Sequence, residues 1–247
     1  MHNFFIKSED KVLGEVYISG ADFNHLKNVL RMKIGDEFLV SLDGVSHLCV
    51  LKEFKDDCAV STIKVENFQD TALPVKIYLF QGLPKADKLE LIIQKAVELG
   101  VDEIVPTETS RSIVKIEEKK AESKRARWQA IAESAAKQSK RTIIPKVSAP
   151  LKFMDAVSLC SKLDVLIVPY ENKRGMIDTL DALKTLKAGM SVGLFIGAEG
   201  GFEDKEIEKL KEVGARVVSL GKRILRTETA AITALSMIML YAECALN

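Results

Sequence analysis

Phe195-Ile196-Gly197-Ala198-Glu199-Gly200-Gly201-Phe202 joins an apolar segment, Val192 to Ile196, to a helix expected from Glu203 to Val213. Ligands of an open α/β sheet bind at the carboxyl ends of its strands, and glycines let a ligand approach the backbone closely. The stretch has neither the spacing of a dinucleotide-binding GxGxxG fingerprint nor the Lys-Ser/Thr of a P-loop. It therefore predicts either a ligand-binding turn or a tight strand-to-helix turn that binds nothing.

Acidic side chains surround this turn. Glu199, Glu203 and Asp204 lie at the start of the expected helix, where free N–H groups and the helix dipole would otherwise attract an anion. A pyrophosphate would be repelled there, whereas a ligand with a positive centre, such as a sulfonium, would be tolerated. The pattern thus disfavours a dinucleotide-binding oxidoreductase, which is the rival class that a glycine-bearing α/β chain first suggests.

A second stretch, Ser219 to Ala230, also follows an expected strand, Arg216 to Leu220. Thr227 is a suitable N-cap for a final helix that begins there. Arg226 and Glu228 could be simple surface charges at a helix start. Two strand-end loops at the same sheet edge nevertheless favour a shared pocket over that interpretation.

Outward from these turns, the chain from residue 75 alternates between strands and helices. This alternation indicates a mostly parallel sheet that is covered on both faces. The expected strands are Val75–Phe80, Glu103–Pro106, a segment near Val147, Val165–Val168, Val192–Ile196 and Arg216–Leu220, and the expected helices include Lys88–Leu99, Glu117–Lys140, Ile177–Leu186, Glu203–Val213 and one from Thr227.

The first seventy residues have a different texture. Short alternating segments at Gly14–Ile18, Glu37–Leu42 and His47–Leu51 are broken by turn signals, which is typical of a small β-barrel. Asp22 is expected to cap a short helix between the first two of them. Because the pattern changes around Asn67 to Pro74, we expect one domain at 1–70 and a second at 71–247.

The formal net charge is +1, but the charges are unevenly placed. Residues 1–70 hold eight Lys and Arg against twelve Asp and Glu, whereas residues 119–146 hold nine basic residues against Glu122 and Glu133. The basic segment fits a phosphate-binding surface and, equally well, a solvated helix face.

Other classes of site are not indicated. The four cysteines and three histidines show no metal-ligand spacing, so no metal is expected. Met1 to Ser8 does not resemble an export signal, and Ala230 to Ala242 is too short to cross a bilayer. We therefore expect a cytoplasmic protein that does not associate with membranes.

Gly197-Ala198-Glu199-Gly200-Gly201-Phe202, followed by Leu220-Gly221 and by Ile224 to Ala230, resembles the SPOUT, or α/β-knot, methyltransferases. Within them the chain is most similar to the ribosomal RNA small-subunit methyltransferase E family, which makes N3-methyluridine in 16S rRNA. The resemblance extends over nearly the whole chain. It includes His25-Leu26 with Val29-Leu30-Arg31 and Gly35-Asp36, Lys85 with Lys88, Lys95 to Val101, Pro106 with Arg111-Ser112, and Glu133, Ala136, Gln138-Ser139, Arg141 and Pro145.

Two positions depart from the family pattern. Ala198 stands where the family usually has proline, and Lys140 stands where glycine is common. The first could loosen the glycine loop, and neither change removes a donor side chain.

The resemblance implies an α/β fold with a PUA-like N-terminal β-barrel and a C-terminal domain threaded into a trefoil knot. It also implies a homodimer and S-adenosylmethionine bound among the knot loops, chiefly by backbone groups. The cofactor-binding residues carried over in this way are Pro169, Tyr170, Glu171, Ile196, Gly197, Glu199, Gly200, Gly201, Leu220, Gly221, Ile224, Leu225, Arg226, Thr229 and Ala230.

For the reaction, the expected candidates for holding the uracil base and its charge are Arg111, Gln138 and Arg141, with Arg226 or Glu228 at the methyl side. Lys27, Arg31, Lys124 and Arg127 are expected to contact the RNA. The expected partner is 16S rRNA, alone or in the small ribosomal subunit. A protein that kept the fold as an idle RNA-binding or assembly factor is the remaining alternative.

Overall fold

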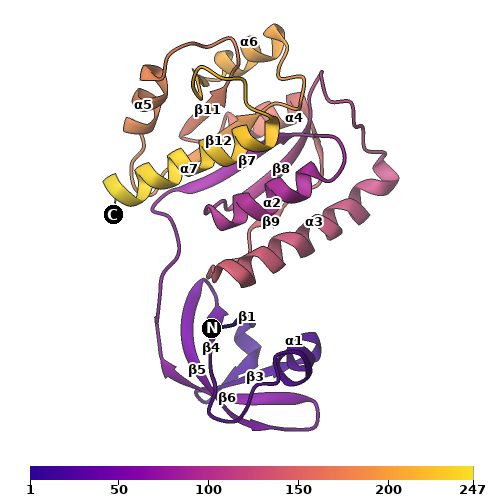
Figure 1. Cartoon of the computed structure of the whole chain (residues 1–247), viewed down its shortest axis with the longest axis vertical. Helices are drawn as coiled ribbons and strands as arrows, with labels where there is room; N and C mark the ends of the chain where they lie inside the picture. Colours follow the sequence, from indigo (N-terminus) through magenta and orange to yellow (C-terminus); the bar gives the residue numbers. More distant parts are fainter. Residues whose placement is uncertain (247) are drawn as a thin grey trace. The chain divides into compact units, whose positions relative to one another are not determined.

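The computed structural model describes residues 1–246, which form two compact units (Figure 1). The first unit contains Met1–Ala72 together with Ala136–Ile144. The second contains Leu73–Ala135 and the chain from Pro145 onward. The last turn of one long helix therefore groups with the N-terminal residues and not with the helix's own beginning.

The first unit is built on a six-stranded sheet. Its strand order is an open path, β1-β4-β5-β6-β3-β2, so within the described residues the sheet is a half-barrel. All pairs are antiparallel except β1 with β4. The strands are β1 Asn3–Phe5, β2 Lys11–Val12, β3 Glu15–Ser19, β4 Glu37–Leu42, β5 Val45–Phe54 and β6 Cys58–Val65.

Alternating apolar side chains give this sheet its buried face. Phe4 and Phe38 meet edge to face with ring centroids 5.5 Å apart, and both are fully buried. Leu26 joins the same core from a helical segment, α1 (Gly20–Asn24), that continues into a π-helical turn at His25–Val29.

The expectation that Asp22 caps this helix is wrong. Ser19 occupies the N-cap position, and Asp22 lies inside α1. The carboxylate of Asp22 instead accepts a hydrogen bond of 2.9 Å from the ammonium group of Lys137. A partner 115 residues away has thus replaced the local capping role that the spacing suggests.

The second unit contains a seven-stranded sheet in which every pair is parallel, as the alternation predicts. The strand order is β10-β8-β7-β12-β11-β13, with β9 paired to β8. The strands are β7 Lys76–Gly82, β8 Glu103–Glu108, β9 Lys146–Val147, β10 Leu151–Lys152, β11 Val165–Pro169, β12 Ser191–Ile196 and β13 Arg216–Val218. The helices are α2 Lys88–Glu98, α3 Glu118–Ser139, α4 Phe153–Cys160, α5 Ile177–Lys184, α6 Asp204–Glu212 and α7 Thr227–Ala245.

Both faces of this sheet are covered. Phe80 of β7 stacks on Phe195 of β12, and this pair belongs to a core that includes residues of α4 and α6. Successive side chains of a strand point to opposite faces, so Leu79, which is also fully buried, faces the other layer. Figure 1 shows α2 and α7 side by side over the sheet, and these two helices are in contact.

The order β12-β11-β13 brings three successive carboxyl ends to one edge of the sheet. The loops that leave these strands are 170–176, 197–203 and 219–226. They include both stretches that the sequence marks as ligand-binding turns.

Candidate active site

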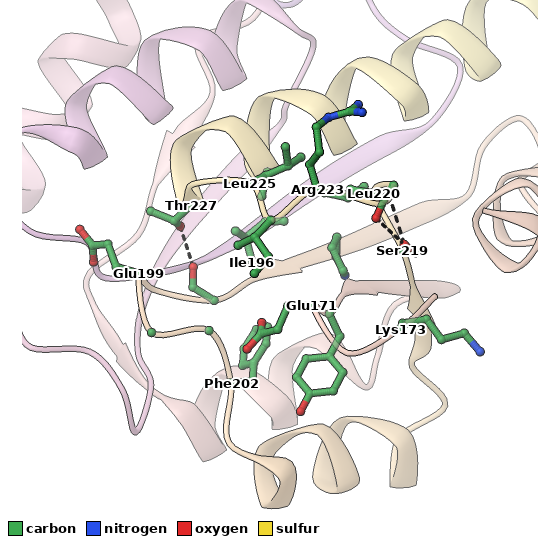
Figure 2. Close-up of a pocket in the computed structure, with 18 of the residues that line it drawn as sticks. Glu171, Lys173, Ile196, Glu199, Phe202, Ser219, Leu220, Arg223, Leu225 and Thr227 are labelled. Carbon is green, nitrogen blue, oxygen red and sulfur yellow. Dashed lines mark hydrogen bonds between the residues drawn. The ribbon is translucent and has the colours of Figure 1, made fainter. Parts of the chain in front are cut away.

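A cavity of about 200 Å³ lies among these three loops (Figure 2). Every loop contributes to its wall, and α7 closes it through its first turn. The lining residues are Pro169, Tyr170, Glu171, Lys173, Arg174, Ile196, Gly197, Ala198, Glu199, Gly200, Gly201, Phe202, Ser219, Leu220, Gly221, Arg223, Ile224, Leu225, Thr227 and Ala230.

The glycine loop, residues 197–202, is a tight turn that needs its glycines. Gly201 donates a backbone hydrogen bond to Ala198 and has a φ of +67°, which L side chains rarely adopt. A Cβ on Gly201 would also come within 2.5 Å of the Glu171 carboxylate. Glycine at this position therefore allows a carboxylate to lie directly against the loop backbone.

Thr227 ties the start of the glycine loop to α7. Its hydroxyl donates a hydrogen bond of 2.6 Å to the Gly197 carbonyl and accepts one of 2.9 Å from the Gln81 amide at the end of β7. Both side chains are buried. The loop is thus bonded to the central strand of the sheet through one hydroxyl group.

Glu199 ties the middle of the loop to the start of α2. Its carboxylate accepts hydrogen bonds from the Lys85 backbone N–H at 2.9 Å and from the Lys88 ammonium group at 3.1 Å. Burial opposes ionisation of this carboxyl, but these hydrogen bonds outweigh it, and the pKa of Glu199 is lowered. The same ammonium group lies 3.7 Å from Glu228, whose Oε2 is buried and has no hydrogen-bond partner among residues 1–246.

Arg111 lies over the far end of the loop. Its guanidinium donates a hydrogen bond of 2.8 Å to the Gly200 carbonyl and is 3.9 Å from the Glu171 carboxylate. A Cβ on Gly200 would stand 2.9 Å from the Cβ of Arg111, so the two backbones are close. A charged donor is therefore held beside the cavity, with an acid next to it.

The start of α6 offers no free site for an anion. Glu206 in the first turn accepts the backbone N–H of the N-cap residue Glu203 on its carboxylate, and the Glu206 N–H donates to the Glu203 carbonyl. These acids occupy the groups that a pyrophosphate would need. The geometry therefore agrees with the sequence in disfavouring a dinucleotide ligand.

The chain matches a family model described as an RNA methyltransferase domain over residues 71–239, and one described as an RNA methyltransferase PUA domain over residues 18–57. Across 251 aligned positions it is 39% identical to the ribosomal RNA small subunit methyltransferase E of Bacillus subtilis, with 98% of both chains covered. The chain belongs to the ribosomal RNA small-subunit methyltransferase E family.

Other members of the family agree with this assignment. The Synechocystis protein of the same name is 34% identical, over 98% of this chain and 78% of its own. The crystal structure of the Neisseria gonorrhoeae ribosomal RNA small subunit methyltransferase E, bound to S-adenosyl methionine, superimposes with a TM-score of 0.81 at 28% identity, covering 97% of each chain. The family's α/β methyltransferase fold with a PUA-type domain is therefore the fold of this chain.

In this member of the family, most residues expected to bind the cofactor line the cavity. Two do not: Arg226 and Thr229 are exposed and lie outside it. Several lining residues were not anticipated, namely Lys173, Arg174, Ala198, Phe202, Ser219, Arg223 and Thr227. Ala198 and Phe202 belong to the quoted glycine stretch and could have been included, whereas Lys173 and Arg174 have no local signal.

The expectation that Thr227 is the N-cap of α7 is wrong. Arg226 occupies the N-cap position, with extended backbone angles and no side-chain cap, and Thr227 is the first helical residue. Its hydroxyl donates a hydrogen bond to the Gly197 carbonyl instead.

The five candidate catalytic residues divide between the two units. Arg111, Arg226 and Glu228 belong to the second unit, with Arg111 in contact with the glycine loop. Gln138 and Arg141 belong to the first. Gln138 is exposed, whereas Arg141 is 6% exposed and its backbone carbonyl accepts hydrogen bonds from Asn3 and Ser41.

The four expected RNA contacts are placed as follows. In the first unit, Lys27 lies over the rings of Phe23 and Phe54, and Arg31 is exposed with a φ of +53°. In α3, the ammonium group of Lys124 lies 5.8 Å from the centre of the Trp128 ring, and Arg127 pairs with Glu90 at 2.8 Å.

Within the described part of the chain, no three His, Cys, Asp or Glu side chains gather as a metal site. Burial raises the pKa of Cys49 to about 12 and that of Cys160 to about 11, so these thiols stay protonated at neutral pH. No helix among residues 1–246 has both the length and the apolar character needed to span a bilayer.

Proposed function

We propose that this chain transfers a methyl group from S-adenosylmethionine to N3 of a uridine in 16S ribosomal RNA. The observation that carries the proposal is the cavity at the three strand ends, in a chain whose family is known. Its glycine loop is bonded at Gly197, Glu199 and Gly200 to three separate elements. A loop fixed in this way can hold a ligand in one orientation, which is what an in-line transfer requires.

The cavity suits S-adenosylmethionine chemically. When bound, this cofactor supplies an electrophilic methyl group on a positively charged sulfur. Ile196, Leu220 and Leu225 offer apolar walls for a purine, and Glu171 places a carboxylate beside Gly201 that favours a cation. We assign cofactor binding to Pro169, Tyr170, Glu171, Ile196, Gly197, Glu199, Gly200, Gly201, Leu220, Gly221, Ile224, Leu225 and Ala230. Arg226 and Thr229, which are not part of the cavity lining, are kept as proposed supporting residues.

The uridine N3–H is a weak acid, so the site must remove its proton or stabilise the resulting anion. Arg111 can hold the developing negative charge, because its guanidinium is fixed by Gly200 and keeps further donors free in its fork. Gln138 and Arg141 are the further proposed candidates for holding the base. Arg226 or Glu228 acts on the side of the site where the cofactor's methyl group would lie.

The remaining assignments follow the family. We propose that residues 1–70, with their open six-stranded sheet, form a PUA-like domain that binds rRNA, and that residues 71–247 form a trefoil-knotted methyltransferase domain. Lys27, Arg31, Lys124 and Arg127 are the proposed RNA contacts. The protein would act in the cytoplasm on 16S rRNA or the small ribosomal subunit, without a metal.

We also propose that the chain acts as a homodimer. Ile177 and Leu180 of α5 and Leu240 of α7 are apolar side chains that are 76%, 49% and 62% exposed. We place the association surface at these exposed apolar side chains. Sedimentation at micromolar concentration should give the mass of two chains, and a monomer would contradict the proposal.

Two measurements test the function. Calorimetric titration should show S-adenosylmethionine binding, and mass mapping of small subunits incubated with protein and cofactor should show one new methyl on a 16S rRNA uridine. Binding without methylation would favour the idle RNA-binding factor. Absence of both would reject the methyltransferase proposal.

A further inference from the structure

Arg111 stands at the apex of a turn that is held by hydroxyl groups. Ser112 donates its backbone N–H to the Thr109 carbonyl at 3.0 Å, and Thr109 donates its own to the Ser112 hydroxyl at 3.1 Å. Thr109 and Ser112 are buried, whereas the Arg111 side chain is 46% exposed. The turn at the end of β8 therefore exposes the charged side chain of Arg111 and buries Thr109 and Ser112.

The turn is also held by a hydrogen bond to a buried carboxylate of α6. Glu206, in the first turn of α6, is 4% exposed. One of its oxygens accepts the Glu203 N–H at 2.9 Å, which is the ordinary requirement of a capping box. The other accepts the Ser110 N–H at 2.8 Å, from a residue 96 positions earlier in the chain.

Helix capping does not require this second bond. It joins the residue before Arg111 to the helix that begins two residues after Phe202, the end of the glycine loop. Arg111 in turn bonds to the Gly200 carbonyl inside that loop. Two hydrogen bonds thus link α6 to the glycine loop through the turn that carries Arg111. One joins Glu206 to Ser110, and the other joins Arg111 to Gly200.

We propose that Glu206 is a positioning residue, which sets the place of Arg111 over the glycine loop and so its action in the proposed methyl transfer. The inference rests on the proposed function, because it concerns the group that holds the uridine charge. Close packing of Arg111 on Gly200 leaves little room for adjustment, since a Cβ on Gly200 would stand 2.9 Å from that of Arg111. A turn released at Ser110 would therefore displace the guanidinium.

The test is Glu206→Gln in the full-length protein. An amide has one acceptor oxygen, and its NH₂ group cannot accept from a second backbone N–H, so one of the two bonds is lost. We expect kcat to fall about tenfold to a hundredfold, as displacements near 1 Å do, with the Kd for S-adenosylmethionine within about twofold. Amide exchange of the Thr109–Ser112 turn should also become faster.

Glu203→Ala is the matched control. It removes a negative charge from the N-cap position of the same helix, but it leaves the Glu206 bonds to Glu203 and Ser110 in place. We expect a small fall in Tm and a kcat within about twofold of the wild type. Should Glu206→Gln fail to fold, Glu206→Asp, which is too short to reach both donors, must show the same separation of kcat from Tm.

Equal losses of kcat in the Glu206 and Glu203 variants would overturn the inference and leave a purely structural carboxylate. Loss of cofactor affinity in parallel with kcat would also overturn it. A wild-type protein that fails to methylate small subunits would instead reject the proposed function, so the two failures are distinguishable.

Discussion

The hydroxyl of Thr227 donates a hydrogen bond of 2.6 Å to the backbone carbonyl of Gly197, across 30 residues of chain. Figure 2 shows this bond between the first turn of α7 and the start of the glycine loop. The Gln81 amide donates to the same hydroxyl from the end of β7. One buried group therefore joins the two strand-end stretches to the central sheet.

Replacing Thr227 by valine keeps the shape and removes this group. The Gly197 carbonyl loses its donor, and we expect the free energy of unfolding to fall by about 1–3 kcal/mol. The Kd for S-adenosylmethionine should rise more than fivefold, because the loop that lines the cavity is released. Urea denaturation and calorimetry measure the two effects. Thr227→Ser keeps the hydroxyl, so a loss of affinity as large as that of the valine variant would contradict the role of this bond.

Replacing Arg111 by alanine removes a charge that the structure places beside the cavity but not within its lining. We expect turnover to fall at least about a hundredfold, as for loss of a donor to a developing anion, with cofactor affinity within a few fold. Labelled methyl transfer to small subunits measures the first and calorimetry the second. A parallel loss of both quantities would mean that Arg111 is only a support of the glycine loop.

Strands and most helices could be predicted from the sequence, because their signal is local. The apolar alternation of Glu37–Leu42 gives β4 with the same bounds, and the expected helix Glu117–Lys140 differs from α3 by one residue at each end. Parallel pairing follows from the alternation of strands and helices. The open path of the first sheet could not be foreseen, because closure depends on pairing between strands that are distant in sequence.

The two wrong predictions share one physical cause. Asp22 and Thr227 are residue types that favour N-caps, and each stands near a helix start. In the structure, each instead bonds to a distant partner, Lys137 or Gly197. N-cap preferences therefore located the two helix starts to within a few residues, but they did not predict the hydrogen-bond partners of Asp22 and Thr227.

The cavity itself was largely predictable because glycines and strand ends mark it. Its supports were not, since Lys88 and Glu206 stand in ordinary amphipathic helices and act only through contacts with segments far along the chain. No spacing within α2 or α6 indicates such a role.

The lowered pKa of Glu199 predicts a pH dependence. A carboxyl whose pKa is lower in the folded state stabilises the fold above its unfolded pKa, and this contribution is lost as the pH falls through the folded value. The difference in free energy of unfolding between wild type and Glu199→Gln should have its largest value near neutral pH. It should shrink as the pH falls below 4.5, the ordinary pKa of a glutamate carboxyl. Urea titrations along a pH series measure it. The exposed Glu208 provides the control, and a Glu208→Gln variant with the same pH profile would contradict the assignment.

Lys140 occupies a backbone conformation that suits glycine. Its φ is +59°, in the left-handed region that L side chains rarely adopt. Replacement by glycine should raise the free energy of unfolding by about 0.5–1 kcal/mol, because relief of backbone strain exceeds the added entropy of the unfolded chain. Lys140→Ala keeps the Cβ and should give no such gain. Equal stabilisation by both would show that the lysine side chain, and not the backbone angle, is the source.

The proposed RNA contacts predict a change in salt dependence. Arg31, Lys124 and Arg127 carry charge on exposed side chains, and each phosphate contact contributes about 0.7 to 0.9 to the slope of log K against log salt, from single strands to duplex. Replacing all three by glutamine should reduce that slope by about 2 to 3 if each meets one phosphate. A variant with Lys187, Lys205 and Lys211 replaced by glutamine removes the same charge from other exposed positions. Filter binding to 16S rRNA fragments across a salt series should leave the slope of this control close to that of the wild type. Equal changes in both triple variants would attribute the effect to net charge and reject these three RNA contacts.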